Sequence, residues 1–369
     1  MAKYKLGDIC EIVSGSTPKT GIDEYWDGNI KWITPAELND DTYIINDSVR
    51  KITELAVMKT GLSSFPKGTV ILSSRAPIGK VAIAGCEMYC NQGFKNLICS
   101  DKINSKYLYW FLKGNTAYLN SLGRGATFKE ISKRIVSEIE INVPNIEKQE
   151  EVVSTLEKIS ESIALRKKEL RDLDDLIKAR FVEMFGDVQH EEKYKGIQLR
   201  ELCTTMSGGT PSTKFPEYYE GDIPWISTVS LGPNYIDGTN AKGHITQEAV
   251  DNSATKLIPA GNILFGTRVG VGKSSLNSVD ICTNQDIVAI VGIDESKFNR
   301  LFIKHVLDAY QPYYDSIKKG ATILGITGDD LKDTLIPNVP IEIQIEFEKF
   351  VHQVDKSKVV YQGYFQYIA

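Results

Sequence analysis

The 369-residue chain contains two copies of one large unit. The segment Ser14-Gly-Ser-Thr-Pro18 recurs as Ser207-Gly-Gly-Thr-Pro211, at an offset of 193 residues. The same offset matches, without a gap, Tyr25 to Tyr218, Gly28 to Gly221, Trp32-Ile33 to Trp225-Ile226, Ile52-Thr53 to Ile245-Thr246, Arg75 to Arg268, Gly79-Lys80 to Gly272-Lys273, and Asn91-Gln92 to Asn284-Gln285. A slip of two residues then aligns Gly125-Ala-Thr127 with Gly320-Ala-Thr322, and Gln149 with Gln344. The period is far too long for a solenoid, so we expect two similar globular units.

The two copies differ between these matched positions. Residues 38–50 and 231–243, for example, show no common pattern. A shared framework with unlike loops is typical of two copies of one fold that bind two different ligands.

Composition and local patterns indicate the fold class. With 42% hydrophobic and 25% charged residues, the chain is typical of a soluble protein with packed cores. Short β-type runs bounded by Gly, Pro, Asn and Asp occur at 69–73, 80–84 and 286–291, and helical stretches at 105–120 and 298–317. The prediction is an α+β fold with mixed or antiparallel sheets.

Each copy ends in a segment with helical periodicity. Residues 145–186 carry apolar side chains seven residues apart, and residues 341–369 carry a shorter, more aromatic stripe. The predicted seam residues are Leu156, Ile163, Leu170, Ile177, Met184, Phe347, Val351, Val354 and Tyr361. The longer helix would measure about 60 Å. We expect the two helices to pair as an antiparallel coiled-coil spacer between globular domains at 1–144 and 187–340. The alternative is that 145–186 is an interdomain helix lying on a domain surface.

Several classes of protein are disfavoured. The net charge of −5 argues against a polybasic nucleic-acid tail, although local basic surfaces remain possible. No apolar run is long enough for a membrane span, and the N-terminus lacks a signal-peptide core, so we expect a cytoplasmic protein. Cys86 and Cys90 have no second ligand pair, which disfavours zinc and any other metal site. The run Gly266 to Ser274 has one residue too many for a phosphate-binding loop.

No catalytic signature occurs in the sequence, so the chain is predicted not to be an enzyme and has no catalytic candidates. The recurring polar residues suit nucleic-acid binding instead, since amides pair with adenine edges and cations contact phosphates. The alternative for each repeated residue is a role in the shared framework. The candidate DNA-binding residues are Lys19, Trp26, Arg75, Lys80, Asn91, Gln92, Arg124, Lys129, Lys214, Arg268, Lys273, Asn284, Gln285, Lys318 and Lys319.

The sequence resembles the specificity subunits of type I restriction–modification systems. The resemblance rests on the duplicated order of weak motifs. They include Gly68-Thr-Val-Ile-Leu-Ser-Ser-Arg75, Val143-Pro-Asn-Ile-Glu-Lys-Gln149 and Gly261-Asn-Ile-Leu-Phe-Gly-Thr-Arg268, together with the matched segments above. The C-terminal helix is shorter than the family pattern suggests.

The resemblance implies two target recognition domains, each recognising half of a split, asymmetric site in double-stranded DNA. The helices would set the gap and dock two methyltransferase subunits, which ATP-dependent restriction and translocase subunits would join. S-adenosylmethionine, ATP and Mg²⁺ would belong to those partners, with no cofactor in this chain. The competing hypotheses are an enzyme whose motifs escaped notice and a scaffold that binds two proteins.

Overall fold

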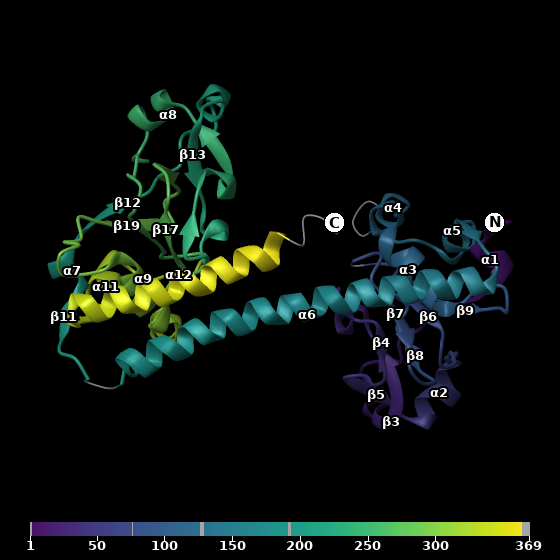
Figure 1. Cartoon of the computed structure of the whole chain (residues 1–369). Coiled ribbons are helices and arrows are strands. Elements are labelled where there is room, and N and C mark those ends of the chain that lie inside the picture. Colours follow the sequence, from purple (N-terminus) through teal and green to yellow (C-terminus); the bar gives the residue numbers. More distant parts are fainter. Residues whose placement is uncertain (1, 76, 126–128, 191–192, 364–369) are drawn as a thin grey trace. The chain divides into compact units, whose positions relative to one another are not determined.

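The computed structural model describes residues 2–75, 77–125, 129–190 and 193–363. It forms two compact units, residues 1–165 (unit 1) and 166–369 (unit 2), each with its own sheets and cores (Figure 1).

Unit 1 contains three sheets built from strands far apart in sequence. The largest has five strands in the order β2-β9-β6-β7-β4, in which only β4 pairs in parallel fashion. A second has the order β5-β3-β8, and β1 pairs with β10. The bounds are β1 Ala2–Lys5, β2 Cys10–Ser14, β3 Trp26–Ile33, β4 Ile44–Ile45, β5 Arg50–Ile52, β6 Val70–Leu72, β7 Val81–Ala84, β8 Tyr89–Cys90, β9 Lys95–Cys99 and β10 Glu140–Val143.

Unit 2 repeats this arrangement strand for strand. Its sheets have the orders β12-β19-β16-β17-β14 and β15-β13-β18, and β11 pairs with β20. The bounds are β11 Gly196–Gln198, β12 Thr204–Ser207, β13 Ile223–Ile226, β14 Tyr235–Ile236, β15 Gly243–Ile245, β16 Ile263–Gly266, β17 Ser274–Asn277, β18 Cys282–Thr283, β19 Ile287–Val291 and β20 Leu335–Pro337. The predicted duplication and the mixed-sheet α+β fold are therefore confirmed.

Short helices flank the sheets in both units. The predicted helical stretch 105–120 is two helices separated at Asn115, and 298–317 is likewise two helices separated at Tyr310. The helices are α1 Leu6–Ile9, α2 Glu54–Thr60, α3 Ser105–Gly114, α4 Thr116–Ser121, α5 Lys133–Ser137, α7 Leu199–Leu202, α8 Gln247–Asp251, α9 Arg300–Ala309, α10 Gln311–Ile317 and α11 Gly328–Lys332. The 3₁₀ turns are Asp23–Tyr25, Pro35–Glu37, Pro216–Tyr219, Thr228–Ser230 and Gly238–Asn240.

Two long helices, α6 Ile146–Phe185 and α12 Ile341–Gly363, contact each other within unit 2. Arg180 Nη2 donates to Glu346 Oε1 at 3.1 Å, and Lys358 Nζ lies 2.6 Å from Asp174 Oδ1. The contact nearer the end of α12 involves the residue nearer the start of α6. The two helices therefore run antiparallel, as predicted.

Only some of the predicted seam residues are buried where these helices pack. Ile177 is buried, but Leu156, Ile163, Leu170 and Met184 are only half-buried. The ring of Phe347 instead packs at 5.5 Å from Phe181 and from Phe185, two residues that the heptad spacing did not identify.

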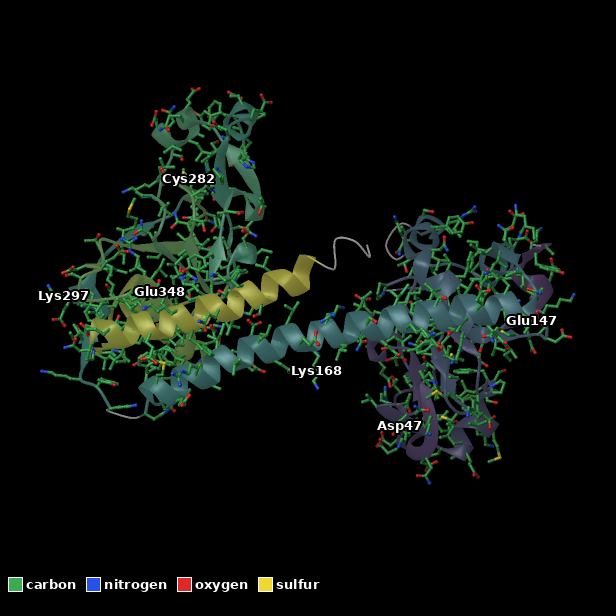
Figure 2. The ribbon with its side chains drawn as sticks, in the orientation of Figure 1. Asp47, Glu147, Lys168, Cys282, Lys297 and Glu348 are labelled. Atoms are coloured by element: carbon green, nitrogen blue, oxygen red, sulfur yellow. The ribbon has the colours of Figure 1, made fainter. Side chains whose placement is uncertain are left out.

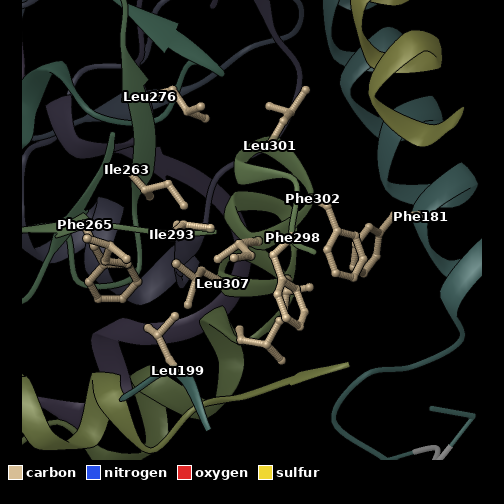
Figure 3. Close-up of a cluster of buried hydrophobic side chains, with 14 of the residues drawn as sticks. Phe181, Leu199, Ile263, Phe265, Leu276, Ile293, Phe298, Leu301, Phe302 and Leu307 are labelled. Carbon is tan, nitrogen blue, oxygen red and sulfur yellow. The ribbon is translucent and has the colours of Figure 1, made fainter. Parts of the chain in front are cut away.

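The apolar face of α12 belongs to the core of unit 2. Phe347, Val351 and Val354 are buried in one cluster with Phe302 of α9. Figure 3 shows Phe302 and Phe181 of this cluster side by side. The side chain of Tyr361 lies outside the described residues. The two helices therefore pack against a globular domain here rather than forming a free-standing two-helix seam.

The repeated glutamines join each long helix to the preceding domain. Gln149 and Gln344 are completely buried. Gln149 Oε1 accepts from the backbone N–H of Asn104 at 2.8 Å, and Gln344 Oε1 accepts from that of Asn299 at the same distance. Each side-chain amide also donates to two backbone carbonyls. The match between these glutamines is thus structural.

Candidate nucleic-acid interface

Four repeated loops of unit 1 come together at the ends of its strands. They are 14–18, 73–75 with 77–80, 91–93, and 123–125 with 129–131. The backbone N–H of Ser16 donates to Cys90 O at 3.0 Å, that of Ser74 to Gly93 O at 2.7 Å, and that of Ile131 to Ser74 O at 3.0 Å. Thr17 Oγ1 also donates to Gln92 Oε1. We call this assembly the loop cluster.

Unit 2 forms the same loop cluster from 207–211, 266–273, 283–286 and 318–326. The backbone N–H of Gly209 donates to Thr283 O, that of Thr267 to Asp286 O, and that of Ile326 to Thr267 O, each at 2.8 Å. Thr210 Oγ1 donates to Gln285 Oε1, which repeats the contact between Thr17 and Gln92. The loops singled out by the sequence repeat are therefore neighbours in each unit.

The matched glycines explain how closely these loops approach. A Cβ atom on Gly15 would lie 2.0 Å from Asn91 O, and one on Gly208 would lie 2.1 Å from Asn284 O. No side chain fits at these distances, so the first loop can lie against the Asn-Gln loop only through glycine.

The repeated amides divide between two environments. Asn91 and Asn284 are half-buried and hydrogen-bond locally: Asn91 Oδ1 accepts from Gly93 N at 2.9 Å, and Asn284 Nδ2 donates to Asp286 Oδ2 at 3.1 Å. Gln92 and Gln285 are exposed. Asn91 and Asn284 thus support the loop framework, while the two glutamines face solvent.

The matched arginines each lie near a carboxylate, but from different loops. Arg75 Nη1 is 3.9 Å from Glu130 Oε2, and Arg268 Nη1 is 3.8 Å from Asp286 Oδ1. In unit 1, Glu130 also pairs at 3.2 Å with Lys95, a buried lysine that sequence reasoning did not identify. The carboxylate near the matched arginine therefore comes from a different loop in each unit.

Some of the remaining candidate side chains are exposed, whereas others are buried or already bonded within the protein. Lys80 donates to the backbone oxygens of Pro35 and Leu38, and Lys318 pairs with Asp315. Trp26 is 8% exposed and belongs to a buried cluster, which argues against direct contact with a base. The exposed candidate cations are Lys19, Arg124, Lys129, Lys214, Arg268, Lys273 and Lys319. Residues 126–128 of the repeated Gly-Ala-Thr loop lie outside the described residues.

The cysteine thiols are spread through the cores. Burial raises the pKa of Cys90 to about 12 and that of Cys282 to about 11, so both are protonated at neutral pH. Cys282 lies in unit 2 (Figure 2). Within the described ranges, no three His, Cys, Asp or Glu side chains are grouped so as to hold a metal ion. Nor does any helix in these ranges have the length and apolar character to cross a membrane.

Comparison with known proteins identifies the family. The model of the type I restriction modification DNA specificity domain matches residues 1–174 and again 191–360, one match for each repeat. The MjaIX specificity subunit of Methanocaldococcus jannaschii is 42% identical over 282 residues, which cover 71% of this chain and 64% of that protein. The EcoR124I/EcoR124II specificity subunit of Escherichia coli is 30% identical over 165 residues, covering 43% and 39%. The chain thus spans less than two thirds of the length of these two curated relatives.

Solved structures of related proteins have the same fold. The S subunit of a type I system from M. genitalium matches with a TM-score of 0.53 at 15% identity, covering 99% of this chain and 92% of that one. A chain from a study of type I restriction–modification complex assembly matches with a TM-score of 0.56 at 18% identity, covering 98% and 91%. With two family matches on two structurally repeated units, the chain belongs to the type I restriction–modification DNA specificity subunit family, which is non-catalytic.

Proposed function

We propose that each unit recognises one half of a bipartite, asymmetric DNA site. The observation that carries this proposal is the combination of one repeated frame with unlike segments at 38–50 and 231–243. The strand order, the loop cluster and the buried glutamines are the same in both units. The residues that distinguish two different half-sites must therefore come from the segments in which the two units differ.

The unlike segments are held on the frame by polar contacts with the long helices. In unit 1, Tyr43 Oη donates to Glu157 Oε1 of α6 at 2.6 Å. In unit 2, Asn234 Nδ2 donates to Asp355 Oδ2 of α12 at 2.8 Å. The chemistry differs, but each variable segment contacts a long helix. This arrangement supports a variable recognition segment on a fixed scaffold.

In this proposal, the exposed candidate cations and the two exposed glutamines, which lie in or next to the loop clusters, supply DNA contacts. Lysine and arginine side chains contact phosphates and orient the protein, whereas base edges provide sequence discrimination. Lys80, Asn91 and Asn284 act in the frame, because each of these side chains already makes a hydrogen bond within the protein.

We further propose that α6 and α12 set the gap between half-sites and dock two methyltransferase subunits. On α6, Leu165, Leu176 and Val182 are between 47% and 56% exposed, which suits contact with another protein. Restriction and translocase subunits would complete the complex. S-adenosylmethionine, ATP and Mg²⁺ would bind to the partners, because the family is non-catalytic.

Domain exchange tests the proposal. Residues 1–144 are replaced by the corresponding part of another family member, the chain is expressed with its methyltransferase subunits, and methylated adenines are mapped in the host genome. We expect one half of the methylated sequence to change and the other to stay. Exchange of 187–340 should change the opposite half. A change in both halves, or in neither, contradicts the proposal.

A further inference from the structure

A cation lies near the ring of the repeated tryptophan in each unit, which is Trp32 in unit 1 and Trp225 in unit 2. Arg50 Cζ is 3.6 Å from the ring centroid of Trp26 and 5.7 Å from that of Trp32. In unit 2, Lys242 Nζ is 5.9 Å from the ring centroid of Trp225, the repeat partner of Trp32. Trp32 and Trp225 belong to the shared frame, whereas Trp26 aligns with Tyr219 and both cations come from the unlike segments 38–50 and 231–243.

These tryptophans are hydrogen-bonded to the first loop of the loop cluster. Trp32 Nε1 donates to Ser16 O at 3.0 Å, and Trp225 Nε1 donates to Gly209 O at 3.1 Å. Trp26 packs edge-on against Trp32 at 5.1 Å and donates to Lys19 O at 3.4 Å. The guanidinium of Arg50 therefore rests on a buried surface that the loop cluster itself holds in place.

The guanidinium of Arg50 keeps its donors available. Among the described residues, no carboxylate lies within ion-pair distance of it, because the nearby acids are engaged elsewhere. Asp47 (Figure 2) pairs with Lys51 at 3.4 Å. Glu37 accepts from the backbone N–H groups of Thr34 and Val49 at 2.7 and 2.8 Å. Arg50 itself is exposed. Stacking on an indole fixes the plane of a guanidinium while leaving its N–H edge free.

We propose that Arg50 recognises a guanine base edge in the half-site of unit 1, and that Lys242 makes the corresponding base contact from unit 2. The inference rests on the proposed function and adds specificity-determining residues to it. A planar, preorganised fork matches the O6 and N7 acceptors of guanine. A base contact fits better than a phosphate contact, because both cations lie in the segments where the units differ.

The test uses the full chain with its methyltransferase subunits and genome-wide mapping of methylated adenines. We expect Arg50→Ala to relax one guanine position in one half-site, with discrimination against other bases falling about 5- to 150-fold. Arg50→Lys should retain part of the discrimination, since it keeps the charge but loses the fork. Lys242→Ala should relax a position in the other half-site only.

Two further variants control for folding and for charge. Arg50→Met keeps an apolar side chain against the indole but has no N–H donors, so it should relax the same position as Arg50→Ala. Lys59→Ala removes an exposed cation from α2 of the same unit and should leave the methylated sequence unchanged.

The outcomes separate this inference from the proposed function. An unchanged motif with Arg50→Met overturns the inference alone. The inference is also overturned if the Arg50 variants bind all DNA sequences equally more weakly and their DNA affinity depends less on salt. That is the behaviour expected when a phosphate contact is lost. If the wild-type complex methylates no bipartite sequence, the proposed function fails and the inference fails with it.

Discussion

Gly15 is the residue at which the loop cluster of unit 1 is most closely packed. Because a Cβ there would lie 2.0 Å from Asn91 O, Gly15→Ala forces the first loop away from the Asn-Gln loop. We expect the free energy of unfolding to fall by about 1–3 kcal/mol, the usual cost of overpacking. Urea denaturation of the full chain measures this change.

Gly21 provides the matched control for that substitution. It lies just beyond the same loop, and a Cβ there would meet nothing within 4 Å. Gly21→Ala should change stability by less than about 0.5 kcal/mol. Equal effects of the two substitutions would show that the close approach at Gly15 does not matter.

His305 of α9 makes the stability of unit 2 depend on pH. Its imidazole is 9% exposed, and Nδ1 is 3.8 Å from Asp308 Oδ2. Burial, together with the charges of Lys304 and Lys358, holds the pKa of His305 well below its ordinary value of 6.5. The folded chain therefore binds this proton less readily than the unfolded chain does, so stability is retained above pH 6.5 and falls as the pH drops below it.

The expected loss is up to about 1.4 kcal/mol per pH unit below that value. His305→Phe fills the aromatic site beside Phe347 without a titrating group, and it should reduce the difference in unfolding free energy between pH 7.5 and pH 5.5. His244→Gln, at an exposed position, is the control. If His305→Phe leaves the pH dependence as large as in the wild type, His305 is not its source.

At the scale of elements, the long helix α6 is continuous through a stretch with little packing around it. Leu165 is 56% exposed and Ala164 is exposed, as is Lys168, which Figure 2 labels. Proline inside a helix removes a backbone hydrogen bond and clashes with the preceding turn, at a cost of about 3 kcal/mol. If α6 sets the gap between half-sites, Ala164→Pro should sharply reduce methylation of the wild-type bipartite sequence.

The loss should come without unfolding of either domain, which circular dichroism and chemical denaturation check. Ala164→Gly, which costs about 1 kcal/mol in a helix, should retain most of the methylation. Full methylation by Ala164→Pro with an unaltered gap would exclude α6 as the element that sets the spacing.

The sequence repeat predicted much of the element arrangement, because matched residues are the ones that the frame needs. Gly15, Trp32 and Gln149 all proved to be frame residues that lie against other loops of the same unit. Heptad counting predicted the long helices and the buried Ile177. It missed Phe181 and Phe185, because a seven-residue spacing describes a two-helix seam, whereas α6 here packs against a globular core.

The side chains outside the repeat were the ones that sequence reasoning could not place. Arg50 carries no motif, and its significance comes from a contact with Trp26 that only the fold creates. A cation near a matched tryptophan in an unlike segment is the signal that could have identified it. Conversely, Trp26 is among the predicted DNA-binding residues, although it is buried beneath Arg50.

At the scale of the whole molecule, each buried hydrophobic cluster of the described residues belongs to one unit. In the part of the chain that the structure describes, the six clusters draw their residues from 1–165 alone or from 166–369 alone. Each unit therefore has its own hydrophobic core and can unfold as a separate cooperative domain. We expect calorimetry of the full chain to resolve two transitions rather than one.

One substitution in each core assigns the transitions. Phe347 is completely buried among Phe181, Phe185 and His305. Phe347→Ala should therefore reduce the unfolding free energy of unit 2 by about 3–5 kcal/mol. The transition of unit 2 should move to a lower temperature, and the transition of unit 1 should stay where it is. Gly15→Ala should lower the transition of unit 1. Because the two sites share no partners, their effects in the double variant should add within about 0.5 kcal/mol. A single transition lowered by both substitutions would mean that the continuous helix α6 couples the two units into one cooperative whole.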